Sequence, residues 1–138
     1  MKITRRAAPL LAMAAVLAVA LSGCWGGSVT VTVDDAGSIK TAQVGDRVIV
    51  RLVGNPSTGF TWTRVGPIDE ALAASPLEPV AEGEWEFPAG EDMPGASGIC
   101  IFEYRVARAG TVALSYAYAR SWEAEPVQTF SVVIWARE

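Results

Sequence analysis

Apolar and polar residues alternate with a period of two along most of the chain beyond position 28. Valine alternates with threonine at 29–33, and valine and leucine alternate with arginine at 47–52. Such alternation is typical of β-strands that bury one face. Further strands are predicted at 60–65, 77–85, 99–107, 111–119 and 127–135.

Turn-forming residues separate these predicted strands. The Asp-Asp-Ala-Gly sequence at 34–37 indicates a turn, and 67–74 is predicted to form one or two helical turns that end at Pro76. Many short strands with almost no helix predict an all-β fold, an immunoglobulin-like antiparallel β-sandwich of about seven or eight strands. A small β-barrel is the alternative fold.

The N-terminal segment has the features of an export signal. Basic residues within the first six positions precede an apolar run at 7–21, which is shorter than the roughly 20 residues that span a bilayer. The run ends in Leu-Ser-Gly followed by Cys24, which resembles a bacterial lipoprotein signal. An ordinary secretory signal and a transmembrane anchor are the alternatives.

The lipoprotein resemblance implies a domain organisation and a location. Residues 1–23 would be removed, Cys24 would become an acylated N-terminus, and 24–28 would form a short tether to a domain at 29–138. Stable anchoring requires more than one acyl chain. We therefore expect an exported protein of the cell envelope that is held on the membrane by lipid.

Composition excludes several classes of function. The chain has 11 basic and 15 acidic residues, and loss of three basic residues with the signal leaves a net charge near −7, which disfavours nucleic acid as a partner. The absence of histidine excludes Ser-His-Asp and Cys-His catalysis and any histidine metal site. Cys100 alternates with apolar residues and is predicted to be a buried small side chain. Five acidic residues at 82, 84, 86, 91 and 92 leave a glycosidase-like carboxylate enzyme as an alternative. Those at 82, 84 and 86 alternate along a predicted strand and are expected to form a solvated face.

Three connections between predicted strands stand out by their chemistry, and two predicted strands separate each from the next. An even number of strands returns the chain to the same end of a sandwich, so we expect the three loops to cluster there. The candidate binding residues are Asn55, Pro56, Ser57, Thr58, Gly59 and Phe60 in the first loop, Gly95, Ala96, Ser97 and Gly98 in the second, and Arg120, Ser121 and Trp122 in the third.

Each loop has a physical feature that suits binding. Pro56 fixes its own φ and Gly59 accepts a positive φ, which predicts a rigid, projecting turn with two hydroxyl groups at its tip. Small residues at 95–98 expose backbone to a partner. Trp122 and Arg120 belong to the residue types that most often dominate interface energy.

These three motifs together resemble the chagasin family, which inhibits cysteine peptidases and has an immunoglobulin-like fold. The family pattern is N-P-[ST]-T-G-[FY], then G-x-G-G, then R-P-W; the chain departs from it at Ser97 and at Ser121, where a glycine and a proline are usual. A serine at 121 lacks the φ restraint of proline.

The family resemblance implies a function and a role for each loop. The chain would be a reversible inhibitor of papain-like cysteine peptidases that needs no metal or cofactor, and not an enzyme. The sequence does not indicate an oligomeric state, and a monomer is the default expectation. Ser57 and Thr58 would lie over the catalytic cysteine, 95–98 along the unprimed side of the cleft, and Arg120 and Trp122 on the primed side. The alternative is an envelope lipoprotein whose domain is a general protein-interaction or structural module.

Overall fold

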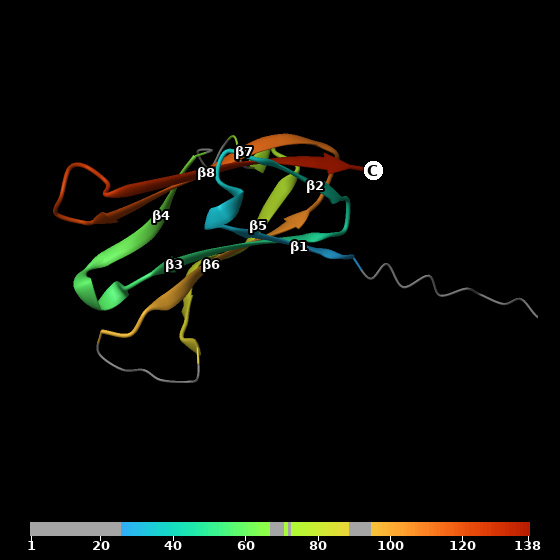
Figure 1. Ribbon diagram of the computed structural model, residues 1–138. Helices are drawn as coiled ribbons and strands as arrows, with labels where there is room; N and C mark the ends of the chain where they lie inside the picture. Colours follow the sequence, from blue (N-terminus) through green and yellow to red (C-terminus); the bar gives the residue numbers. More distant parts are fainter. Residues whose placement is uncertain (1–25, 67–70, 72, 89–94) are drawn as a thin grey trace, which may run out of the picture.

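The protein is a sandwich of two four-stranded β-sheets, seen edge-on in Figure 1. The computed structural model describes residues 26–66, 71, 73–88 and 95–138. The strands are β1 (Ser28–Thr32), β2 (Ile39–Gln43), β3 (Arg47–Gly54), β4 (Phe60–Gly66), β5 (Leu77–Glu86), β6 (Gly98–Val106), β7 (Gly110–Arg120) and β8 (Gln128–Arg137). The described residues also form two short 3₁₀ helices, η1 (Val33–Asp35) and η2 (Pro56–Thr58).

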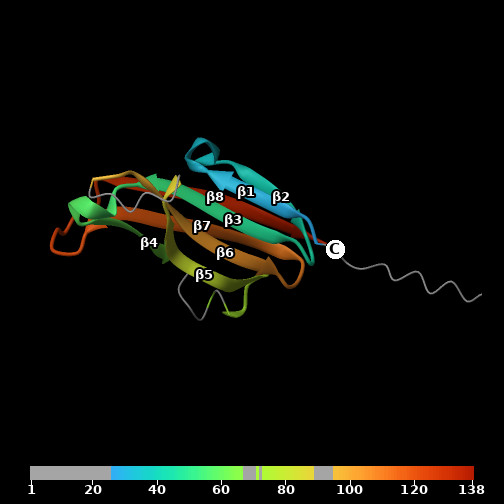
Figure 2. The same cartoon turned by 90° about the horizontal axis from the view of Figure 1, so that it is seen from below.

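The sheet topology confirms the predicted sandwich and excludes the barrel. One sheet has the order β1-β3-β6-β5 and the other β2-β8-β7-β4, and Figure 2 shows the two layers from below. The sandwich is antiparallel except at two places, where β1 pairs with β3 and β2 pairs with β8 in parallel. The physical reason is that the chain changes sheets at η1, so β1 and β2 do not pair with each other as a hairpin.

The core lies between the sheets and contains the apolar face of each predicted strand. On β3, Val48, Val50 and Leu52 are fully buried, and on β6 the alternating residues from Cys100 to Val106 are buried as predicted. Burial of this apolar surface is the main favourable contribution to folding.

A tyrosine pair forms a buried polar contact within this core. The hydroxyl groups of Tyr104 and Tyr116 lie 2.7 Å apart, so that one donates to the other. Burial raises the pKa of Tyr104 to about 12 and raises that of Tyr116 above its ordinary value as well. Both tyrosines therefore stay protonated in the folded protein.

The sequence pattern did not predict β2, which closes one edge of the second sheet. Ile39 at its start is 66% exposed and Ala42 is its buried residue, so the strand has almost no apolar alternation. The strand forms because its backbone pairs with β8, in the register Ile39 to Val133. This pairing joins segments far apart in sequence, which local periodicity does not reveal.

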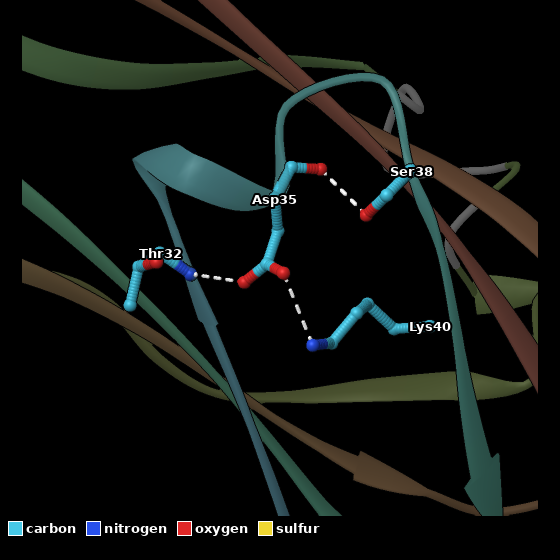
Figure 3. A network of polar contacts seen from close by, with 4 residues as sticks. All are labelled: Thr32, Asp35, Ser38 and Lys40. Atoms are coloured by element: carbon cyan, nitrogen blue, oxygen red, sulfur yellow. Dashed lines mark hydrogen bonds and ion pairs between the residues drawn. The ribbon is translucent and has the colours of Figure 1, made fainter.

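The turn predicted at 34–37 is held by the Asp35 side chain (Figure 3). One carboxylate oxygen accepts a hydrogen bond from the Thr32 backbone N–H at 2.9 Å and the other pairs with the Lys40 ammonium at 3.1 Å. The Ser38 hydroxyl donates to the Asp35 carbonyl oxygen at 2.6 Å. The Thr32 hydrogen bond, followed by Lys40, holds the pKa of Asp35 below its ordinary value. The crossing between the sheets is thereby fixed.

Two expectations lie wholly or partly outside the described residues. Of the predicted helical stretch 67–74, the described residues Ala71 and Ala73 are helical, and 67–70 and 72 are outside. The signal at 1–23 and Cys24 are also outside. Within the described part of the chain, no helix is long and apolar enough to cross a membrane.

Candidate functional site

The three loops predicted to cluster do lie together at one end of the sandwich (Figure 1). The Asn55 side-chain amide donates to the Gly95 carbonyl oxygen at 3.1 Å, which joins the first loop to the second. The Arg120 guanidinium donates to the Thr58 carbonyl oxygen at 3.1 Å, which joins the third loop to the first. Two strands separate each loop from the next, as predicted: β4 and β5, then β6 and β7. The unpredicted strand β2 precedes all three loops and therefore does not change this count.

The first loop is a compact turn stabilised by its own polar groups. The Asn55 side-chain oxygen accepts hydrogen bonds from the Ser57 backbone N–H at 3.1 Å and from the Ser57 hydroxyl at 2.6 Å. The Thr58 hydroxyl donates to the Asn55 carbonyl oxygen at 2.7 Å. Gly59 then reverses the chain with a φ of 82°, a left-handed conformation that favours glycine. Since both exposed hydroxyls donate inward, the tip presents their lone pairs outward as acceptors.

Tyr118 on β7 supports this turn from below, and no sequence signal identified it. Its hydroxyl oxygen accepts a hydrogen bond from the Asn55 backbone N–H at 2.8 Å. Its ring lies 5.2 Å from the ring of Phe60 and 5.0 Å from that of Trp62, measured between centroids. Trp62 is itself fixed by donation from its indole N–H to the Val53 carbonyl oxygen at 3.0 Å. The packed rings of Phe60, Trp62 and Tyr118, together with these two hydrogen bonds, therefore position the first loop.

The second loop enters the sheet through a pair of glycines that face each other. Gly98 is buried as the first residue of β6 and pairs with Gly54 at the end of β3. A β-carbon at Gly98 would lie 2.9 Å from the Phe87 ring and 3.0 Å from the Trp85 ring. Gly98 therefore makes room for aromatic packing, whereas Gly95 has a φ of 88° and open space around it.

The other two predicted residues of this loop, Ala96 and Ser97, are not glycines. Ala96 is half-buried and Ser97 is exposed. Residues 89–94, the earlier part of the connection, are outside the described residues.

The third loop places an exposed tryptophan against the first loop. Trp122 is 70% exposed, and a β-carbon at Gly59 would lie 2.6 Å from its ring. The Arg120 guanidinium carbon lies 4.2 Å from the centroid of the Phe60 ring and 5.8 Å from that of Trp122. Arg120 also pairs with Glu123 at 3.3 Å, so its guanidinium connects the third loop internally and to the first. Ser121 is exposed between these two anchors.

The chemistry of the cluster suits binding to another molecule. Within residues 26–66, 71, 73–88 and 95–138, no group of three or more histidine, cysteine, aspartate or glutamate side chains is arranged to hold a metal ion. Cys100 lies in the core, where burial raises its pKa to about 11, so its thiol is protonated at neutral pH. The loops therefore present hydroxyl acceptors, backbone and one large aromatic ring on a stiff frame.

Two solved structures share the fold of this chain. A cysteine protease inhibitor from Entamoeba histolytica aligns with a TM-score of 0.66 and 21% identity, over 80% of this chain and 96% of that one. The solution structure of amebosin aligns with a TM-score of 0.62 and 18% identity, over 80% and 98% of the two chains. At these identities the likeness establishes the fold alone.

Sequence comparison identifies the family. Chagasin of Trypanosoma cruzi is 37% identical to this chain over 86 residues, which are 62% of this chain and 76% of chagasin. The sequence model of the family described as "Chagasin family peptidase inhibitor I42" matches residues 41–134. This segment begins in β2, ends in β8 and contains all three loops. This chain therefore belongs to the chagasin family, whose members are peptidase inhibitors and not enzymes, as its loop motifs predicted.

Proposed function

We propose that this peptidase inhibitor blocks papain-like cysteine peptidases reversibly by inserting its three loops into the active-site cleft. The observation that carries the proposal is the pair of hydrogen bonds, Asn55 to Gly95 and Arg120 to Thr58, that joins the loops into one surface before any partner binds. A surface fixed in advance loses little conformational entropy on binding, which favours tight association.

The first loop is suited to lie over a catalytic cysteine without being cleaved. Its backbone is folded into a 3₁₀ turn and then a left-handed Gly59, whereas a peptidase cleaves a segment that it can hold extended. The tip at Ser57 and Thr58 offers acceptor lone pairs and no nucleophile. We infer that this loop occupies the centre of the cleft.

The other two loops would flank the centre. Trp122 is a large exposed ring at the surface, and burial of such a ring in a partner is the usual basis of an interface hot spot. Arg120 is already engaged by Thr58, Phe60 and Glu123, so we assign it mainly to positioning Trp122. Gly95 to Gly98 would line the opposite, unprimed side.

We also propose that the chain acts as a monomer outside the cytoplasm of a bacterium, attached to a membrane by lipid on Cys24. The support is the sequence alone: a basic start, a short apolar run and a small-residue site directly before Cys24. With a mature net charge near −7, lipid and not surface charge would supply the membrane attachment.

The test is the inhibition constant for a papain-like peptidase, measured with the mature chain and paired variants. Thr58→Ala is expected to weaken inhibition about fivefold, the equivalent of one lost hydrogen bond. Trp122→Ala is expected to weaken it about thirtyfold, as for a hot-spot tryptophan. The matched controls are Thr111→Ala and Trp135→Ala, since both residues are exposed at the opposite end of the sandwich.

Two outcomes of this test distinguish the inhibitor from the alternative function. Loss of inhibition in the loop variants, with both controls unchanged, supports the three-loop mechanism. A folded chain that fails to inhibit any papain-like peptidase would favour the general protein-interaction module instead.

A further inference from the structure

The chain enters the domain at the end opposite to the three loops, and its first described residues are held tightly there. The Gly27 backbone N–H donates to an Asp46 carboxylate oxygen at 2.7 Å, and the Gly27 carbonyl oxygen accepts from the Arg47 N–H at 2.9 Å. Gly26 packs so closely that a β-carbon there would overlap the Gly45 carbonyl oxygen. The tether expected at 24–28 is thus already part of the fold from Gly26 onward.

The length of strand β3 gives the distance between this end and the loops. It starts at Arg47, beside Gly27, and ends at Gly54, directly before the first loop. Seven steps of about 3.3 Å place the two ends about 23 Å apart. Figures 1 and 2 both show the N-terminal side of β1 and the three loops at opposite ends of the sandwich.

A lipid on Cys24 would therefore hold this end close to the bilayer. Between Gly26 and the lipid-bearing residue lies only Trp25, and two residues extend at most about 7 Å. So short a connection keeps this end of the domain within about 7 Å of the lipid-bearing residue. We define the anchor end as the β2–β3 turn (Val44–Asp46), Arg108 and the end of β8 (Trp135–Glu138).

The side chains of the anchor end suit a layer of lipid headgroups. Val44 is 42% exposed and Trp135 is 48% exposed, and the Arg137 guanidinium carbon lies 5.1 Å from the Trp135 ring centroid. Tryptophan and arginine with an adjacent aliphatic residue are typical of the membrane interface, where each places an apolar body inward and a polar group in water. Because Asp46 and Glu138 offset the charges of Arg108 and Arg137, the apolar contacts would dominate.

We propose that the anchor end rests on the lipid headgroups, with Trp135 and Val44 in the interface, so that the three loops face away from the membrane. This inference rests on the lipid anchor proposed above. Its consequence concerns the partner: the inhibitor is displayed to soluble peptidases that approach from the aqueous side, and a peptidase cleft within a few ångströms of the same bilayer is out of its reach.

Quenching of tryptophan fluorescence by brominated lipid tests the orientation. The mature chain, lipidated at Cys24, is placed in phosphatidylcholine vesicles that contain brominated phosphatidylcholine. Trp135→Phe is expected to remove a quenched component of the fluorescence, and Trp122→Phe is expected to remove only unquenched fluorescence. Quenching that disappears with Trp122→Phe, or that is unaffected by Trp135→Phe, would overturn the proposed orientation.

Two further measurements separate this inference from the proposals on which it rests. Mass spectrometry of the N-terminal peptide shows whether Cys24 carries acyl chains; an unmodified cysteine overturns both the anchor and the orientation, and leaves inhibition untouched. The vesicle-bound chain is expected to inhibit a soluble peptidase within about twofold of the same chain in detergent. A tenfold weaker inhibition on vesicles, from a chain that inhibits normally in detergent, would contradict outward-facing loops while leaving the inhibitory function intact.

Discussion

Substitution of Gly59 by alanine separates the cost of backbone strain from the positioning of Trp122. Gly59 has a φ of 82°, where an L-residue with a β-carbon is strained by about 1–2 kcal/mol. The new β-carbon would also lie 2.6 Å from the far edge of the Trp122 ring. That ring is 70% exposed, so it can swing away at little cost in free energy of unfolding. We therefore expect a modest loss of stability together with a displaced tryptophan.

Gly37→Ala is the matched control because it repeats the strain without the contact. Gly37 has a φ of 73° and no atom lies within 4 Å of the position of its β-carbon. Urea unfolding should show a loss of about 1–2 kcal/mol for both variants. In a peptidase assay, Gly59→Ala should weaken inhibition at least about tenfold, the equivalent of 1.4 kcal/mol of binding, and Gly37→Ala by less than about twofold.

Two results would refute this reasoning. If Gly59→Ala lost stability like its control but inhibited as well as the parent chain, the packing of Trp122 on Gly59 would play no part in binding. If both variants lost inhibition equally, general destabilisation and not the third loop would be responsible.

Three further predictions concern the frame that supports the loops. Tyr118→Phe keeps the aromatic stack but removes the acceptor of the Asn55 N–H, so we expect a loss of about 1 kcal/mol in urea unfolding and inhibition weakened a few-fold; unchanged values for both would contradict the supporting role. Tyr104→Phe leaves the buried Tyr116 hydroxyl unpaired and should cost about 1–3 kcal/mol, whereas the double phenylalanine variant should be more stable than that single variant. A double variant that is less stable still would show that the hydroxyl pair itself is strongly stabilising. The pKa of Asp35 is below its ordinary value of 3.8, so its stabilising effect is present above that pH and is lost as the pH falls through the lower folded-state pKa; Asp35→Asn should make stability in urea less sensitive to acid, and an identical pH dependence would disprove this.

The sequence predicted those parts of the fold that local patterns encode. Strands with one buried face have a two-residue period, and β3 and β6 follow it closely. Counting such strands also predicted that the three loops share one end, because the argument needs only direction and not which strands pair. The hydrogen bonds from Asn55 to Gly95 and from Arg120 to Thr58 confirm that arrangement.

The parts that escaped prediction depend on contacts between distant segments. Strand β2 has no buried stripe of its own and exists through its pairing with β8. Tyr118 looked like one more aromatic residue of a strand, and its role follows from the register that places it opposite Trp62 and beneath Asn55. A usable signal was present for Gly98: Trp85 lies near the end of the neighbouring strand β5 and Phe87 follows that strand directly, and the space that both rings need falls on a glycine.

The central claim, that the loops occupy a peptidase's active-site cleft, is tested most directly by binding to a peptidase whose cleft is already filled. The measurement compares the affinity of the mature chain for a free papain-like peptidase with that for the same peptidase carrying a small covalent inhibitor on its catalytic cysteine. The three-loop account predicts that binding to the blocked enzyme falls at least about a hundredfold, because the first loop and the small inhibitor compete for the same space. Equal affinity for the free and blocked enzymes would contradict the account and would place the contact outside the cleft.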